Sequence, residues 1–414
     1  MTTPEIKGFL LVAVVKMLVV FTAIMVGVIM VIWLERRGSA FLQDRRGPNR
    51  VGPYGLLQGL ADGLKNMMKE ETWPAQADKL IFLLAPTLAF IPSLLLFAVI
   101  PFASPLPPFD VTVHVLGLDF GRWVYTGPIQ MAVADLPVGF LFIIAISSIA
   151  VYGIVLAGWS SNSKYAFLGG LRSSAQMISY EIALGMSLIV VLLLAGNVTL
   201  PAIVARQQVG IWYVFPAALG FLIFVISAFA ETNRLPFDLP EAEAELVTGY
   251  HTEYSSMKFS LFFIAEYAAV ITFSALMVTL FFGGWDIPFT KWDAAVPTAW
   301  NAEAILRVLA TLVAFSLKTL VFVWIYIQVR WTLPRFRFDQ LMNIGWKVLL
   351  PISLGYIGIM ATAILIFHPL EAAHPKWFGA ILFGINLPLL VAFVWGLDRG
   401  RIVVGEFQRA RLEG

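Results

Sequence analysis

The sequence contains no cysteine, and this absence excludes several kinds of redox and metal site. Disulfides, thiolate zinc sites and cysteine-ligated iron–sulfur clusters cannot be built from the residues of this chain. Histidine is also scarce, and the four histidines show no metal-ligand spacing: they are His114, His251, His368 and His374. We therefore expect no metal site in the chain.

Charge is the second thing that the sequence has little of. Only 13% of the 414 residues are charged, against about 25% in a typical soluble domain. Hydrophobic residues make up 59%, and apolar runs of about 20 residues recur along the chain. The net charge of +2 gives no indication of nucleic-acid binding. The composition predicts an all-α polytopic membrane protein.

Nine apolar runs predict transmembrane helices, and they cover residues 9–33, 80–100, 128–158, 177–196, 211–231, 259–283, 305–330, 348–367 and 378–397. Between the first two, apolar residues from Leu56 to Met68 recur at helical spacing with charged residues between them. This pattern predicts an amphipathic helix on the membrane surface. The proline-rich loop 101–127 alternates apolar and polar residues at 111–115, which predicts a short hairpin.

Lysine and arginine predict the orientation of these spans. The loops that follow the first, third, fifth and seventh spans, together with the C-terminal tail, hold 20 of them when Arg330, the last residue of the seventh span, is counted with its loop. The N-terminus and the remaining loops hold 5. Because positive charge is retained on the cytoplasmic side, the N-terminus is predicted outside and the C-terminus in the cytoplasm.

Carboxylates are concentrated between the fifth and sixth spans, where six lie between Ala230 and Tyr254. Acidic residues do little to set topology, and charge at or inside a bilayer often marks a path for ions or protons. Further charges lie within the predicted spans: Lys16, Asp135, Glu181, Glu266 and Lys318. An isolated charge could simply pair with an opposite one. A set that converges on one loop favours a proton or ion path, because crowded carboxylates can share protons.

Several motifs, in a fixed order, resemble a known family. They include Glu35-Arg36-Arg37, the run from Asp44 to Gln58, Ser179-Tyr180-Glu181, Glu231-Thr232-Asn233-Arg234 and the run from Gly249 to Ser255. They resemble the membrane subunit of respiratory complex I, the type I NADH–quinone oxidoreductase, whose mitochondrial homologue is NADH dehydrogenase subunit 1. The resemblance covers about residues 10–367.

The resemblance implies the quinone-chamber subunit of a proton-pumping NADH:quinone oxidoreductase. Its quinone-binding residues would be Arg36, Arg45, Asp62, Lys65, Arg172, Arg234, Phe259 and Phe263. Its carboxylate path would comprise Asp62, Glu181, Glu231, Glu241, Glu243, Glu245, Glu253 and Glu266. Pairing with carboxylates is an equal alternative for Arg172 and Arg234, as is packing for the two phenylalanines.

The resemblance also implies substrate, partners and location. Quinone would be the substrate, while FMN and iron–sulfur clusters would reside only in partner subunits. The partners would be the other membrane-arm subunits, the peripheral-arm subunits and membrane lipid, in the bacterial cytoplasmic membrane, with no nucleic acid.

Two departures from the family pattern stand out. Ser147-Ser148 occupies a place where some relatives carry a carboxylate, so the path here would pass through water or Asp135. Residues 368–414 lie beyond the family core of 1–367 and add a ninth span with a basic tail.

Two other functions remain open at this point. One is the homologous component of a membrane-bound hydrogenase or of another donor-linked complex. The other is a standalone ion transporter, which the absence of an internal repeat disfavours.

Overall fold

The computed structural model describes residues 3–115, 118–239, 247–288, 290–294 and 299–398, and these are mostly helical. The helices are α1 (Thr3–Leu42), α2 (Gln58–Met68), α3 (Lys79–Leu95), α4 (Gly139–Ser160), α5 (Lys164–Ala195), α6 (Leu200–Val209), α7 (Ala218–Glu231), α9 (Ser256–Phe281), α10 (Ala302–Thr332), α11 (Phe338–Asn343), α12 (Leu350–Ala373) and α13 (Pro375–Asp398). Single turns are η1 (Pro53–Gly55), η2 (Leu96–Val99), η3 (Gly249–His251) and η4 (Ile344–Leu349). Strands β1 (Phe109–Val115) and β2 (Leu118–Tyr125) pair antiparallel.

Eight of the described helices are long and apolar enough to cross a membrane, which confirms the all-α polytopic class. The ninth predicted span, at 211–231, contains the shorter helix α7 of 14 residues. Such a helix is about 21 Å long, less than the roughly 30 Å of a hydrocarbon core. Pro216 has no N–H to donate and the helix begins two residues later, so the first part of the predicted span is not helical.

Two predicted boundaries were wrong for identifiable reasons. The third span was placed at 128–158, but α4 begins at Gly139, just after Pro137, so Asp135 lies in the preceding loop. The fourth was placed at 177–196, but α5 begins at Lys164, so Glu181 lies in mid-helix. Hydropathy missed this first part of α5 because it is held by close packing of small residues rather than by an apolar run. A Cβ on Gly170 would lie 3.3 Å from the Ile154 carbonyl oxygen of α4.

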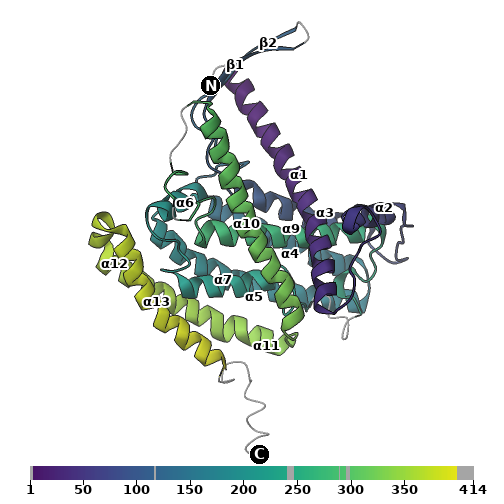
Figure 1. Ribbon diagram of the computed structural model, residues 1–414. Coiled ribbons are helices and arrows are strands. Elements are labelled where there is room, and N and C mark those ends of the chain that lie inside the picture. Colours follow the sequence, from purple (N-terminus) through teal and green to yellow (C-terminus); the bar gives the residue numbers. More distant parts are fainter. Residues whose placement is uncertain (1–2, 116–117, 240–246, 289, 295–298, 399–414) are drawn as a thin grey trace, which may run out of the picture.

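The molecule has two distinct ends, joined by the long helices α1 and α10 (Figure 1). At the hairpin end, β1 and β2 confirm the predicted hairpin and pack against the start of α1, where a Cβ on Gly8 would meet the Val124 carbonyl oxygen. Helix α2 and the start of α9 lie beside the second half of α1, away from the hairpin (Figure 1), and we call this region the α2 end. The predicted amphipathic helix is present there as α2; all eleven of its residues are described and none is buried.

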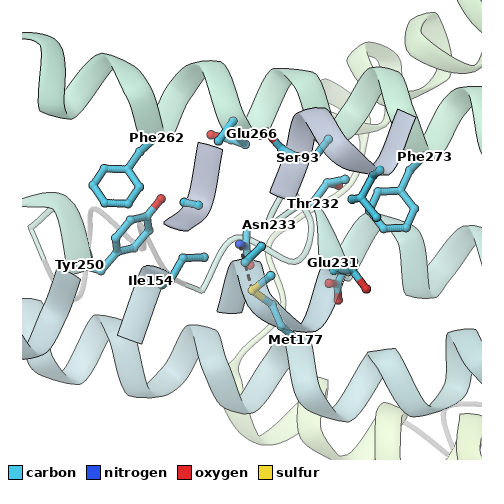
Figure 2. Close-up of a pocket in the computed structure, with 16 residues that line it drawn as sticks. Ser93, Ile154, Met177, Glu231, Thr232, Asn233, Tyr250, Phe262, Glu266 and Phe273 are labelled. Atoms are coloured by element: carbon cyan, nitrogen blue, oxygen red, sulfur yellow. Dashed lines mark hydrogen bonds between the residues drawn. The ribbon is translucent and has the colours of Figure 1, made fainter. Parts of the chain in front are cut away.

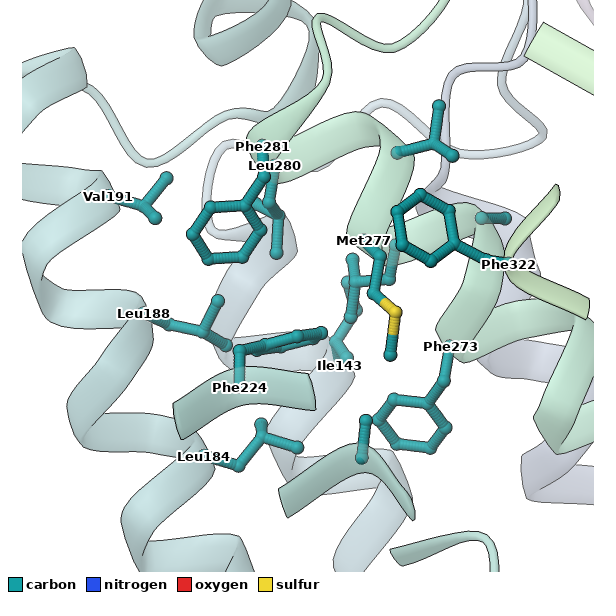
Figure 3. Close-up of a cluster of buried hydrophobic side chains, with 14 of the residues drawn as sticks. Ile143, Leu184, Leu188, Val191, Phe224, Phe273, Met277, Leu280, Phe281 and Phe322 are labelled. Atoms are coloured by element: carbon teal, nitrogen blue, oxygen red, sulfur yellow. The ribbon is translucent and has the colours of Figure 1, made fainter. Parts of the chain in front are cut away.

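The core surrounds the C-terminal half of α9 and is built from aromatic and branched side chains (Figure 3). Every residue from Thr272 to Phe281 is buried. The ring of Phe281 lies 5.5 Å from that of Phe224 on α7, measured between centroids. A helix that is buried on all sides is held rigidly, so the C-terminal half of α9 provides a fixed support for the N-terminal half.

Helix α13 is attached to the core by apolar packing and by one buried amide. Asn386 donates to the Pro216 carbonyl oxygen at 2.6 Å and accepts from the Tyr356 hydroxyl of α12 at 2.6 Å. It also donates to the Leu382 carbonyl oxygen at 3.0 Å. One side chain therefore joins α13 to α12 and to the segment that precedes α7.

Candidate functional site

The larger of two cavities described here opens among α1, α2 and the start of α9 at the α2 end, and we call it the outer cavity. Its volume is about 780 Å³. Most of its wall is apolar, from residues such as Ile32, Leu60 and Ile264. Ligand sites of this size are commonly apolar clefts with a few polar groups that fix orientation.

An ion pair between α1 and α2 lies in the wall of the outer cavity. The Arg36 guanidinium lies 2.5 Å from the Asp62 carboxylate, which also accepts from Gln58 at 3.0 Å. Lys65 lies one turn further along α2 and lines the same cavity, as do Phe259 and Phe263 from α9. The structure thus brings together five of the residues predicted for quinone binding.

Other predicted quinone-binding residues lie elsewhere. Arg45 follows α1 on the exposed surface, where it donates to the Gln43 side chain at 2.7 Å. Arg172 lies on α5, with its guanidinium 5.9 Å from the ring centroid of Phe338. Neither lines the outer cavity.

A second, smaller cavity lies inside the helix bundle, and we call it the inner cavity (Figure 2). Its volume is about 60 Å³, enough for a few water molecules. Figure 2 shows Glu266 and Glu231 approaching it from different helices, α9 and α7. Ser93, Ser147 and Asn233 also line it, so carboxylates, hydroxyls and an amide share one small space.

Two carboxylates are associated with the inner cavity at its α7 side. Glu231 is buried, and its Oε2 atom has no hydrogen-bond partner among the described residues. A buried polar atom of this kind calls for a water molecule or a proton. Glu181 interacts electrostatically with Glu231 and accepts a hydrogen bond from Ser148. Ser147 lines the cavity, and the next residue, Ser148, contacts Glu181.

A cluster of buried charges connects the two cavities. Arg234 lies between two carboxylates: its Nε atom is 2.7 Å from Glu266 Oε1, and its Nη1 atom is 3.3 Å from Glu35 Oε2. The guanidinium also stacks over the Tyr267 ring at 4.2 Å, and Arg330 pairs with Glu35. Burial lowers the pKa of Arg234, but the neighbouring Glu266, Tyr267 and Glu35 outweigh it and hold the pKa well above its ordinary value. Arg234 is therefore a permanent cation.

Helix α9 separates the cavities and presents a different face to each. Phe259, Phe263 and Tyr267 recur every four residues and line the outer cavity. Phe262, Glu266 and Ala269 line the inner cavity. Because Arg234 contacts both Glu266 and Tyr267, it touches one residue from each face.

The remaining predicted residues are placed only in part. Glu253 is partly buried in the loop before α9, and Glu241, Glu243 and Glu245 lie outside the described residues. Within the described ranges, no three histidines, aspartates or glutamates gather as metal ligands, and the expectation of no metal site stays a prediction.

Two charged residues of the central cluster were not predicted. Sequence reasoning gave no role to Glu35 or Arg330, although both contact the cluster around Arg234. Glu35 follows the first apolar run and Arg330 ends the seventh, and charged residues at the edges of apolar runs are expected in any membrane protein. No local pattern distinguishes them from such charges.

The chain is similar to known proteins over most of its length. A family model described as NADH dehydrogenase matches residues 15–361. An NADH-quinone oxidoreductase subunit of Geobacter metallireducens is 49% identical over 347 residues, which cover 84% of this chain and 94% of that protein. The "NADH-quinone oxidoreductase subunit 8" of Rhodothermus marinus is 46% identical over 352 residues, covering 84% and 96%.

Proposed function

The chain belongs to the NADH dehydrogenase family as a membrane component of an NADH-quinone oxidoreductase, and we propose that it forms the quinone chamber and part of the proton path of that complex. The observation that carries the proposal is the arrangement around α9. One face of the helix borders an apolar cavity, the other borders a cavity with two carboxylates, and Arg234 contacts both faces.

The outer cavity has the chemistry that a quinone requires. An isoprenoid tail would pack against the apolar side chains of α1 and α2 and against Phe259 and Phe263. The Arg36–Asp62 pair and Lys65 would form polar contacts with the quinone headgroup as it moves through the cavity. Because α2 has an exposed apolar surface, a quinone dissolved in the membrane could reach this cavity directly from the lipid.

The inner cavity supplies groups that can respond to charge. Reduction of a quinone creates negative charge, which would compete with Glu266 and Glu35 for the permanent cation Arg234. A carboxylate that loses part of its counter-charge takes up a proton more readily. Glu231 and Glu181 would pass that proton on, together with Glu241, Glu243, Glu245 and Glu253 of the adjoining loop.

The rest of the reaction belongs to partner subunits. Electrons would arrive from FMN and iron–sulfur clusters in the peripheral arm, which we place at the α2 end because the outer cavity lies there. The other membrane-arm subunits would receive the coupling. The N-terminus would lie outside the bacterial cytoplasmic membrane and the C-terminus in the cytoplasm, as the distribution of lysine and arginine predicts.

Photoaffinity labelling of the purified complex tests the proposal. A photoreactive quinone with a long isoprenoid tail should label peptides that contain residues 25–36, 59–69 or 254–267 of this chain. Excess unmodified quinone should compete with the labelling. Labelling confined to other subunits would refute the quinone-chamber assignment.

A further inference from the structure

The segment that joins α2 to α3 has no regular structure of its own. Residues 69–78 contain no helix or strand, and residues 69–73 are all exposed to solvent. We call this segment the strap. Exposed, irregular backbone of this kind is mobile unless other contacts hold it.

Contacts with the start of α9 hold the strap and the end of α2. The Ser255 hydroxyl accepts from the Thr72 backbone N–H at 2.9 Å and from its hydroxyl at 2.8 Å. The Ser256 hydroxyl donates to the Asn66 carbonyl oxygen at 2.8 Å. Thus two consecutive serines hold the chain on both sides of the end of α2. Ser256 contacts Asn66 within the helix, and Ser255 contacts Thr72 in the strap.

Lys258 provides the central contact of this attachment. Its side chain is only 4% exposed, and its ammonium lies 3.4 Å from the ring centroid of Trp73. Glu71 Oε2 lies 3.4 Å from the same ammonium. A buried cation needs such compensation, and a desolvated cation–π contact is stronger than an exposed one. Phe82 lies against Trp73 and stacks on Tyr254 at 3.9 Å, so the attachment rests on the packed helices.

The backbone at this point is strained. Ser256 has a φ of 57°, in the left-handed region that residues other than glycine seldom adopt. Such strain persists only where neighbouring contacts determine the conformation, and it is often found at functional sites. The contacts of Ser255, Ser256 and Lys258 with α2 and the strap hold the backbone at Ser256 in this conformation.

Helix α2 is attached near each of its ends, in addition to the Arg36–Asp62 pair in its middle. At its start, the Tyr54 carbonyl oxygen accepts from Trp33 at 3.1 Å and from Arg37 at 3.0 Å, both on α1. At its other end lies the strap. Between these ends no residue of the fully described α2 is buried, although α2 forms a wall of the outer cavity. The position of this wall is therefore set by these attachments and by the Arg36–Asp62 pair rather than by buried core residues of α2.

We infer that Lys258, held against Trp73, is a positioning residue that fixes the α2 wall of the outer cavity and thereby sets the preference for quinones with long apolar tails. The inference rests on the proposed function, because it assumes that the outer cavity holds quinone. Lys258 itself does not line the cavity, whereas its neighbours Met257 and Phe259 do. It acts on the substrate only through the wall.

Kinetics with two quinones form the first test. In the purified complex, Lys258→Met keeps most of the side-chain volume and removes the charge. The variant should raise KM for a long-tailed quinone roughly fivefold, as expected from the loss of one desolvated cation–π contact, with kcat and the KM for a short-tailed quinone unchanged. Trp73→Leu should raise this KM by a similar factor. Trp73→Phe keeps an aromatic face, so its KM for the long-tailed quinone should stay close to the wild-type value. Lys79→Met is the matched control, because Lys79 is exposed at the beginning of α3.

A distance measurement that needs no quinone forms the second test. The chain has no cysteine, so spin labels at Met68→Cys and Leu84→Cys report only on α2 and α3 in the purified full chain. Lys258→Met should broaden the distribution of distances between them, and Lys79→Met should not. An unchanged distribution would overturn the positioning role. A broadened distribution with equal KM changes for both quinones would overturn the role in tail preference.

These results are distinguishable from a failure of the proposed function. If quinone does not use the outer cavity, the photoreactive quinone described above labels none of its peptides even in the wild-type complex. A broadened distribution together with that result would retain the attachment of α2 and remove its connection to quinone.

Discussion

In the C-terminal half of α9, from Thr272 to Phe281, every side chain is buried, whereas in the N-terminal half, from Ser256 to Ala269, buried and half-buried side chains are mixed and most of them line a cavity. The C-terminal half contacts aromatic and aliphatic side chains from α5, α7 and α10, as Figure 3 shows for Phe224 and Phe322. The N-terminal half carries Lys258 and Glu266, both in ion pairs. One continuous helix therefore joins a rigid core to the two cavities.

This difference shows how a membrane protein can support charge without losing its fold. Close packing fixes the C-terminal half of the helix, so the N-terminal half need not contribute equally to stability. Buried ions add little net stability, because desolvation offsets most of their attraction. The charges can therefore be selected for function, and changes in the two halves should differ in their effect on stability and on activity.

The largest effect is expected from Phe281→Ala in the C-terminal half. Removing a fully buried ring should lower the free energy of unfolding by about 3–5 kcal/mol. The thermal unfolding midpoint of the purified chain, compared with that of wild type, measures the loss. An unchanged midpoint would mean that this half of α9 is not the fixed support that we describe.

The next effect concerns the charge cluster. Arg234→Met leaves Glu35 and Glu266 buried with less compensation, which should lower the free energy of unfolding by about 3 kcal/mol. Adding Glu266→Gln removes one of those charges and should restore part of the loss. The four unfolding midpoints form a double-mutant cycle, and strictly additive changes would show that the two residues do not interact.

A pH effect is expected just beyond the C-terminal half. The pKa of Asp286 is raised from 3.8 to about 6, mainly by burial. Asp293 also raises this pKa, whereas the hydrogen bond from Trp212 and the charge of Lys318 lower it. Because the folded pKa lies above the unfolded one, the fold holds the proton more tightly. Stability should be greatest below about pH 4 and should fall by roughly 1–2 kcal/mol, with solvent screening included, as the pH rises to about 6. Asp286→Asn should abolish this fall in unfolding midpoints measured across that range; a fall that persists would assign it to another group.

The smallest effect on stability is expected on the outer-cavity face. Phe263→Ala removes part of a cavity wall rather than of the core, so the unfolding midpoint should change little. The KM for a long-tailed quinone should rise roughly fivefold, which corresponds to about 1 kcal/mol of lost binding. Steady-state rates with long-tailed and short-tailed quinones measure this. A large drop in the unfolding midpoint with no change in KM would erase the distinction between the two halves.

Most of the fold could be predicted from the sequence, because long apolar runs and helical spacing act locally. Helix α2 was predicted from the spacing of residues such as Leu60, Leu64 and Met67 alone. The start of α5 was missed because its stability comes from close contact with α4, which no local pattern reveals. Likewise α7 is shorter than its apolar run because of Pro216.

The candidate site was predicted less evenly. Arg36, Asp62 and Lys65 were found because they lie in motifs of one local segment, and the structure does bring them to one cavity. The Arg234–Glu35 pair joins residues 199 positions apart. Lys258 on α9 likewise contacts Trp73 in the strap, which lies far from it in the sequence. A single sequence contains no signal for such distant pairs.

The two faces of α9 were equally hidden from sequence reasoning. Phe262 and Phe263 are identical residues at adjacent positions, yet Phe262 lines the inner cavity and Phe263 lines the outer cavity. Which face of an apolar helix meets which neighbour depends on the packing of the whole bundle.

The attachment of α13 has a consequence for biogenesis. This helix follows the part of the chain that matches the family, and its Asn386 meets all its partners only after α7 and α12 are in place. An amide facing lipid is unfavourable but does not prevent insertion of an otherwise apolar helix. We therefore expect α13 to insert into the bilayer before it docks against α12 and the segment that precedes α7. Formation of the Asn386 contacts would then mark the completion of the folded chain.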